Sequence, residues 1–147
     1  MWGELKSVLS NRGFGIKAKK CLYEGVIAPT ALYGSEVWGM RSAEKMKFNI
    51  LEMKCLRSLV GVSRIDRVRD EEVRSRAGIE RELASREDQR VLRWFWHIER
   101  MDEHRMARRV LMAVVSGGRV RVRPRLSWMD GVKVALGNGG MTMETAR

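Results

Sequence analysis

The chain of 147 residues has a mass of 16.9 kDa, which is the size of one ordinary domain and short for a two-domain enzyme. Its 29 basic and 18 acidic residues leave a formal net charge of +11, which makes a polyanion the first partner to consider. With 44% hydrophobic residues the chain is too apolar to be wholly disordered, and its longest uncharged run, residues 25–35, is shorter than the roughly 20 residues that span a membrane.

The helical spacing of the apolar residues predicts an all-α fold, a small bundle of about five to seven helices with a basic loop between the last two main helices. The first helix contains Ile16, Tyr23 and Ile27 and is expected to end or kink at Pro29, which lacks an amide hydrogen. A short helical or irregular piece is expected over residues 32–38.

The central helix is predicted over residues 42–60, with Ser42 as its N-cap and Gly61 just past its end. A helix with apolar residues on two sides is expected to be buried on two sides. One side holds Met46, Ile50, Met53 and Val60, and the other holds Phe48, Leu51, Cys55 and Leu59.

Asp70 is predicted to cap a short helix that ends before Gly78, and a long helix follows over residues 81–100. Asp102 is predicted to cap the next helix, which residues 116–118 end. The apolar residues of that helix are Met106, Val110, Leu111 and Val114. The last helix is marked by Trp128, Val132 and Leu136, ends at Gly137 and precedes a frayed tail.

The long helix gathers basic side chains on one side and apolar side chains on another. At 100° per residue the basic stripe consists of Arg86, Arg90, Arg93, His97 and Arg100, and the apolar wall consists of Ala84, Val91, Phe95 and Ile98. Arginine supplies 21 of the 29 basic residues, and its planar guanidinium binds phosphate through two donors at once. A biased base composition of the gene would also enrich arginine.

Trp94 and Trp96 fall on the two flanks of this stripe. A nucleic-acid strand would place its phosphates on the arginines and its unpaired bases on the indole faces. The alternative is that both rings seal the edge of the core under arginine stems. His97 is expected to be exposed or capping and not a metal ligand.

A second basic element is the arm of residues 119–125, where arginine alternates with valine or proline. In an extended conformation its arginines point to one side about 6.6 Å apart and span about 20 Å. They are Arg119, Arg121, Arg123 and Arg125. We expect the arm to be a solvated connector that becomes ordered on a nucleic-acid backbone.

The residue pattern predicts no catalytic site, no metal site and no cofactor. Cys21, Cys55, His97 and His104 lack zinc-site spacing, and no adjacent pair of aspartates is present to hold Mg²⁺. No serine or cysteine lies in a nucleophile motif with a histidine base. Two cysteines and the absence of a signal-peptide pattern predict an intracellular, reducing compartment, either nucleus or cytoplasm.

Five short sequence segments stand out, and in chain order they are Leu22-Tyr23 with Ile27 to Trp38, Leu51 to Arg57, Asp66 to Val73, Leu92 to Phe95, and Arg123-Pro124-Arg125 before Trp128. Together they resemble the C-terminal part of reverse transcriptases from non-LTR (LINE-type) retrotransposons. The resemblance implies that residues 1–61 are a thumb-like helical part and that residues 62–147 are a C-terminal helical extension.

In that family the polymerase palm supplies the catalytic aspartates, commonly in a Tyr/Phe-x-Asp-Asp string, which this sequence lacks. The resemblance therefore implies a fragment of an RNA-directed DNA polymerase that is no enzyme by itself. Two residues depart from the family, because Trp96 and Val122 stand where it usually has glycine. These changes suit a drifting copy of the element as well as a new function.

The sequence as a whole predicts a protein that binds RNA, DNA or their hybrid and has no membrane partner. One alternative is an interaction module, with Tyr23, Ile27 and Trp38 on the former palm-facing surface docking another protein or a second copy. The other alternative is a transposon relic with no selected role.

Overall fold

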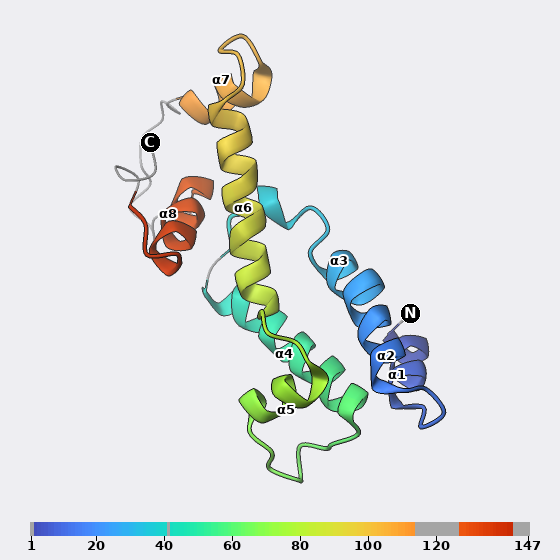
Figure 1. The fold of residues 1–147 in the computed structure, drawn as a ribbon. Helices are drawn as coiled ribbons and strands as arrows, with labels where there is room; N and C mark the ends of the chain where they lie inside the picture. The colour runs from blue at the N-terminus through green and yellow to red at the C-terminus, as the bar shows by residue number, and fades with distance from the viewer. Residues whose placement is uncertain (1, 41, 114–126, 143–147) are drawn as a thin grey trace. The chain divides into compact units, whose positions relative to one another are not determined.

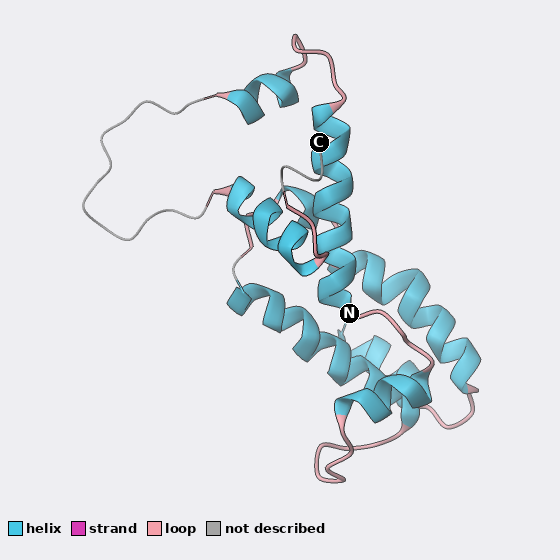
Figure 2. Cartoon of the chain, turned by 60° about the vertical axis from the view of Figure 1, so that its left-hand side comes forward, coloured by secondary structure: helices cyan, strands magenta, loops and turns pink. Residues whose placement is uncertain are grey.

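A computed structural model describes residues 2–40, 42–113 and 127–142 (Figures 1 and 2). The helices are α1 (Trp2–Ser10), α2 (Ile16–Leu22), α3 (Ala28–Ala31), α4 (Ser42–Val60), α5 (Asp70–Ala77), α6 (Leu83–Glu99), α7 (Met106–Met112) and α8 (Trp128–Asn138). A π-helical turn (Tyr23–Ile27) joins α2 to α3, and a 3-10 turn covers Ser35–Val37. These ranges contain no strand, so the predicted all-α fold is confirmed; the predicted basic loop lies outside them.

The contacts between Cα atoms divide the chain into two units. Unit 1 comprises residues 1–33 and 42–86, and unit 2 comprises residues 34–41 and 87–147. The division therefore falls within α6. The regions predicted from the family resemblance have a different boundary, after residue 61, and remain a prediction about descent.

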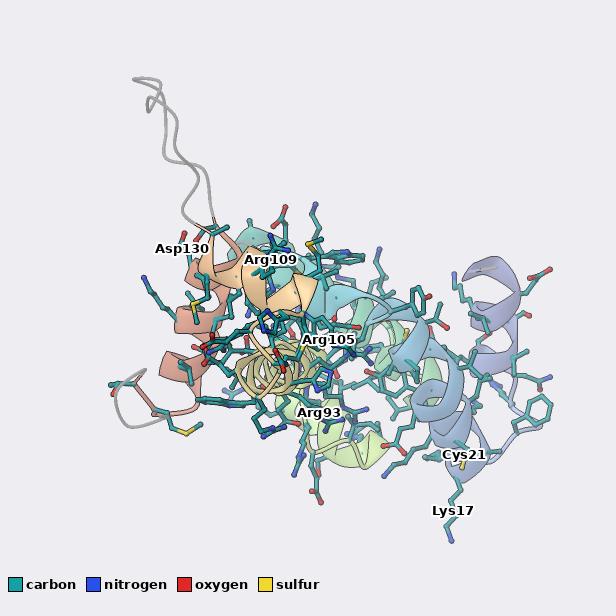
Figure 3. All side chains as sticks on the ribbon, turned by 90° about the horizontal axis from the view of Figure 1, so that it is seen from above. Lys17, Cys21, Arg93, Arg105, Arg109 and Asp130 are labelled. Carbon is teal, nitrogen blue, oxygen red and sulfur yellow. The ribbon has the colours of Figure 1, made fainter. Side chains whose placement is uncertain are left out.

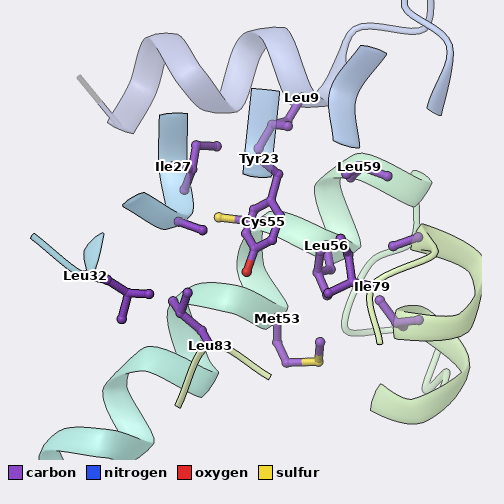
Figure 4. Packing of buried hydrophobic residues seen from close by; sticks show 13 residues of the cluster. Leu9, Tyr23, Ile27, Leu32, Met53, Cys55, Leu56, Leu59, Ile79 and Leu83 are labelled. Carbon is purple, nitrogen blue, oxygen red and sulfur yellow. The ribbon is translucent and has the colours of Figure 1, made fainter. Parts of the chain in front are cut away.

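The core of unit 1 is organised by α4, which packs against α1, α2 and α5. Its buried side meets residues from the other helices, and Figure 4 shows Leu9, Tyr23, Ile27, Cys55, Leu56 and Leu59 in this cluster. On its other side Met46 is 63% exposed and Ile50 is 55% exposed. The prediction that this helix is buried on two sides is therefore wrong for Met46 and Ile50, which no described element of unit 1 covers, whereas Met53 on the same side is buried in the core.

The N-terminal helices differ from the prediction in two ways. The helical segment that begins at Ile16 does not end at Pro29 but continues to Ala31, through a π turn that ends at Ile27, two residues before the proline. The hydrogen-bond ladder shifts at a π turn, and a residue without an amide hydrogen fits at such a shift. The helix α1 was not predicted, although its Leu5 and Leu9 are spaced i, i+4 and Leu9 is fully buried.

Two predicted N-caps are wrong. Asp70 is the first residue of α5, and its carboxylate lies 2.6 Å from Nη2 of Arg57. Asp102 accepts a 2.9 Å hydrogen bond from the amide of His104, and α7 begins only at Met106. In both cases the carboxylate is occupied by a donor other than the amides of the helix that it was predicted to cap.

The core of unit 2 is built by α6 and α8. Of the predicted apolar wall of α6, Val91, Phe95 and Ile98 are buried, and of the predicted apolar positions of α8, Val132 and Leu136 are buried. Ala84 and Trp128 are only partly buried. The start of α8 is capped reciprocally: Oγ of Ser127 accepts from the amide of Asp130 at 3.2 Å, and the Asp130 carboxylate accepts from the amide of Ser127 at 2.8 Å. Among the described helices of both units, none is long and apolar enough to cross a membrane.

Candidate nucleic-acid interface

The predicted basic stripe lies on α6, but two of its arginines have carboxylate partners. In unit 1 the guanidinium of Arg86 lies 3.7 Å from Oε1 of Glu24. In unit 2 Arg90 donates from Nε and Nη2 to Oε2 of Glu36, at 3.3 Å and 3.1 Å. A hydrogen bond from its own backbone and the contact with Arg90 lower the pKa of Glu36. These two arginines are therefore neutralised in the free chain.

The remaining three members of the stripe form an exposed face, which we call the α6 basic face. Arg93, His97 and Arg100 are all exposed and are spaced i, i+4, i+7. Arg100 directly follows the last residue of α6, and its amide still donates to the carbonyl oxygen of Trp96 at 3.2 Å. At 1.5 Å per residue the face is about 10.5 Å long. Neither Arg93 nor Arg100 forms an ion pair with any described residue. The face ends at Arg100, because the acidic residues Asp102 and Glu103 follow it in the loop.

The two flanking tryptophans have different environments. Trp96 packs against the core of unit 2, with its ring centroid 4.9 Å from that of Phe95 in an edge-on arrangement. Trp94 is half-buried, and its ring lies 5.4 Å from the imidazole of His97. The core-sealing alternative therefore describes Trp96, whereas Trp94 borders the α6 basic face.

His97 also bears on the question of metal binding. It is exposed, and among the described residues its neighbouring ring is the indole of Trp94. Within the described ranges, no group of three or more His, Cys, Asp or Glu side chains is placed to hold a metal ion.

Two exposed arginines near the end of α6 were not among the predicted site residues. Arg105 precedes α7 and Arg109 lies within it, and neither forms an ion pair with a described residue (Figure 3). Arg108, between them, is held 2.7 Å from Glu99. The sequence shows three nearby arginines here, but only the spatial arrangement separates the paired one from the two exposed ones.

The excess positive charge is not spread evenly over the described residues. In unit 1 they include 16 basic and 10 acidic side chains, whereas in unit 2 they include seven of each. The four arginines of the predicted arm, Arg119, Arg121, Arg123 and Arg125, lie outside the described residues. The excess of positive charge in unit 2 therefore comes from Arg41 and the four arm arginines, which lie outside the described residues. The described part of unit 2 offers phosphate only local clusters such as the α6 basic face.

A buried carboxylate in unit 1 was not anticipated. Glu52 of α4 is fully buried, and its Oε1 accepts from the Tyr23 hydroxyl at 3.0 Å and from the Leu83 amide at 3.1 Å. Its Oε2 accepts from Nη2 of Arg74 at 2.7 Å. Both oxygens thus have protein donors, and the carboxylate joins the π turn, α5 and the first residue of α6. We interpret Glu52 as structural, because its acceptors are already used within the core.

This network changes the pKa of two neighbouring groups. Burial, followed by the charge of Glu52, raises the pKa of the Tyr23 hydroxyl, and the same two causes raise the pKa of the Cys55 thiol to about 12. The sequence does carry a signal for Glu52, since it lies four and seven residues before the buried Leu56 and Leu59. An acidic residue on the same side of the helix as these leucines is buried, and its carboxylate then needs hydrogen-bond donors from the core.

The docking surface predicted as an alternative is partly contradicted. Tyr23 and Ile27 are 0% and 5% exposed, because the π turn places them in the cluster beside α4. Of the three residues named for that surface, only Trp38 is exposed, at 50%. A partner therefore cannot reach Tyr23 and Ile27, the two ends of the π turn, in the folded unit.

The chain was compared with known proteins at three levels. Protein-family models, curated proteins and solved structures gave no match to it.

Proposed function

We propose that this chain binds RNA, DNA or their hybrid, as a fragment descended from the reverse transcriptase of a non-LTR retrotransposon, and that it does not catalyse synthesis by itself. The observation that carries the binding proposal is the α6 basic face, where Arg93 and Arg100 are exposed and free of carboxylates among the described residues. Such arginines bind phosphate without first losing a partner. Arg86 and Arg90 would have to leave Glu24 and Glu36.

The proposed descent is supported by the order of the five segments in the sequence. Two of them lie within main helices, Leu51 to Arg57 in α4 and Leu92 to Phe95 in α6. A third, Asp66 to Val73, begins in the loop before α5 and ends inside that helix. A helical thumb and helical extension are what the resemblance implies for these positions. No catalytic step is proposed, because the family's paired aspartates have no counterpart in the sequence.

The binding proposal is tested by fluorescence anisotropy with labelled single-stranded, duplex and hybrid oligonucleotides over a range of salt concentrations. Two arginines of the α6 basic face and four of the arm give about six phosphate contacts. The logarithm of the binding constant should then fall with the logarithm of salt concentration with a slope of about −4 on a single strand and about −5 on a duplex. No binding at low salt, or a flat salt response, would contradict the proposal.

The role of the α6 basic face is tested by the double variant Arg93→Ala/Arg100→Ala. Removing two phosphate contacts should make the salt slope shallower by about 1.4 to 1.8. The matched control is Arg76→Ala, an exposed arginine of unit 1 that pairs with Glu72. The control removes one positive charge and the double variant removes two, so a loss of affinity in the control at least half as large as in the double variant would mean that binding follows net charge alone and that the assigned face is wrong.

A further inference from the structure

Unit 1 contains a groove of about 920 Å³ along α4. Met46, Ile50 and Met53 line it at spacings of i, i+4 and i+7, so they follow one side of the helix for two turns. Met46 and Ile50 are more than half exposed, and Val62 adds to the apolar lining from the loop after α4. Met53 is 9% exposed and belongs to the core, whereas the described part of unit 1 leaves Met46 and Ile50 without a cover, which is typical of an interaction site.

The walls of the groove are held in place by hydrogen bonds within unit 1. From α4, the guanidinium of Arg57 donates to the carbonyl oxygens of Ser63 and Val68, at 3.3 Å and 2.7 Å. It also binds the Asp70 carboxylate at the start of α5. These contacts fix the loop of residues 61–69 against α4. The groove is thus formed before a partner arrives, which lowers the entropic cost of binding.

The charges around the groove favour an acidic occupant. Of its carboxylates, Asp70 and Glu82 are already paired with arginines, and Glu71 forms no ion pair with a described residue. Three cations in the lining, Lys6, Lys54 and Arg64, also form no ion pair with a described residue. The unpaired groups therefore leave a positive rim around an apolar row.

We propose that this groove binds an amphipathic helix of a partner protein, with the partner's apolar residues on Met46 and Ile50 and its acidic residues beside Lys6, Lys54 and Arg64. Apolar anchors at i, i+4 and i+7 are the pattern by which one helix receives another, and methionine adapts its shape to a partner. Nucleic acid fits less well, because phosphates on Lys6, Lys54 or Arg64 would leave Met46 and Ile50 without an apolar partner. The groove shares no residue with the α6 basic face and does not depend on the proposed function.

The test uses the full chain and a fluorescein-labelled helical peptide of about 14 residues, with leucine along one face and glutamate on both flanks. One control peptide has lysine in place of glutamate, and another has the same composition in scrambled order. We expect the acidic amphipathic peptide to bind about 10-fold more tightly than either control.

The protein variants separate the groove from the rest of the surface. Ile50→Glu should weaken binding of the acidic peptide about 10-fold or more, because it places a carboxylate where the apolar face docks. Ile50→Ala should weaken it less, and both changes lie at a 55% exposed position, so circular dichroism should be unaltered. The matched control is Val134→Glu, which adds the same charge to an exposed apolar position on α8.

Two results would overturn the inference. The first is equal affinity for the acidic, lysine and scrambled peptides, or unchanged peptide binding by a folded Ile50→Glu variant. The second is that a labelled single-stranded oligonucleotide no longer binds to Ile50→Glu but still binds to Arg93→Ala/Arg100→Ala. That result would assign the groove to nucleic acid. Loss of oligonucleotide binding in the arginine variant alone leaves the peptide result unaffected, so the two proposals fail independently.

Discussion

Replacing Glu52 with glutamine tests the buried network of unit 1. Glutamine keeps the shape of the side chain but has no charge and brings an NH₂ group among three donors, those of Tyr23, Arg74 and Leu83. If its oxygen keeps Tyr23 and Leu83, its nitrogen faces the guanidinium of Arg74, and the ion pair at 2.7 Å is lost.

The magnitude follows from the burial of the pair. Removing one partner of a buried ion pair costs about 3–5 kcal/mol. The Arg74 side chain is 16% exposed and keeps its pairing with Glu82, so we expect a loss of about 2–4 kcal/mol in the free energy of unfolding. For a chain of this length that corresponds to a fall in Tm of roughly 5–15 °C.

The assay is urea unfolding followed by far-UV circular dichroism. The matched control is Glu80→Gln, because Glu80 is exposed and forms no ion pair with a described residue, and it should change the stability by less than about 0.5 kcal/mol. If Glu52→Gln is as mild as Glu80→Gln, the charge of Glu52 does not hold the three segments together and the reasoning is wrong.

Further predictions concern both units. Ser127→Ala should lower the free energy of unfolding by about 1 kcal/mol in urea, because α8 loses its N-cap. Hydrogen bonds from Ser127 lower the pKa of the Asp130 carboxyl in the folded chain. They therefore stabilise the fold above the unfolded pKa of about 3.9, and this stabilisation disappears as the pH falls through the folded pKa. In Ser127→Ala the free energy of unfolding should depend less steeply on pH in this acidic range. At neutral pH a thiol reagent should label the exposed Cys21 and spare the buried Cys55 until denaturant is added, and immediate labelling of both would contradict the packing. Phe95→Ala should cost about 3–5 kcal/mol, and an unchanged urea midpoint would place this ring outside the core.

The sequence by itself determined the features that depend on near neighbours along the chain. The apolar spacing of Val91 and Phe95 predicted which side of α6 is buried, because 3.6 residues per turn align such positions on any helix. Gly61 and Gly78 marked the ends of α4 and α5, where φ is +75° and +68°, a conformation that residues with a Cβ rarely adopt. His97 was expected to be exposed or capping, and it is exposed on the predicted stripe.

The tertiary structure alone decided which of these side chains remain available. Arg90 and its partner Glu36 are 54 residues apart, so helical phase places the arginine on the stripe without revealing that a carboxylate meets it. Likewise, the phase of α4 shows two apolar sides, but only the positions of the other helices determine that Met46 and Ile50 stay uncovered. The direction in which a side chain points from its helix axis depends only on its position in the helix. Ion pairing and burial depend on segments that folding brings together from distant parts of the chain.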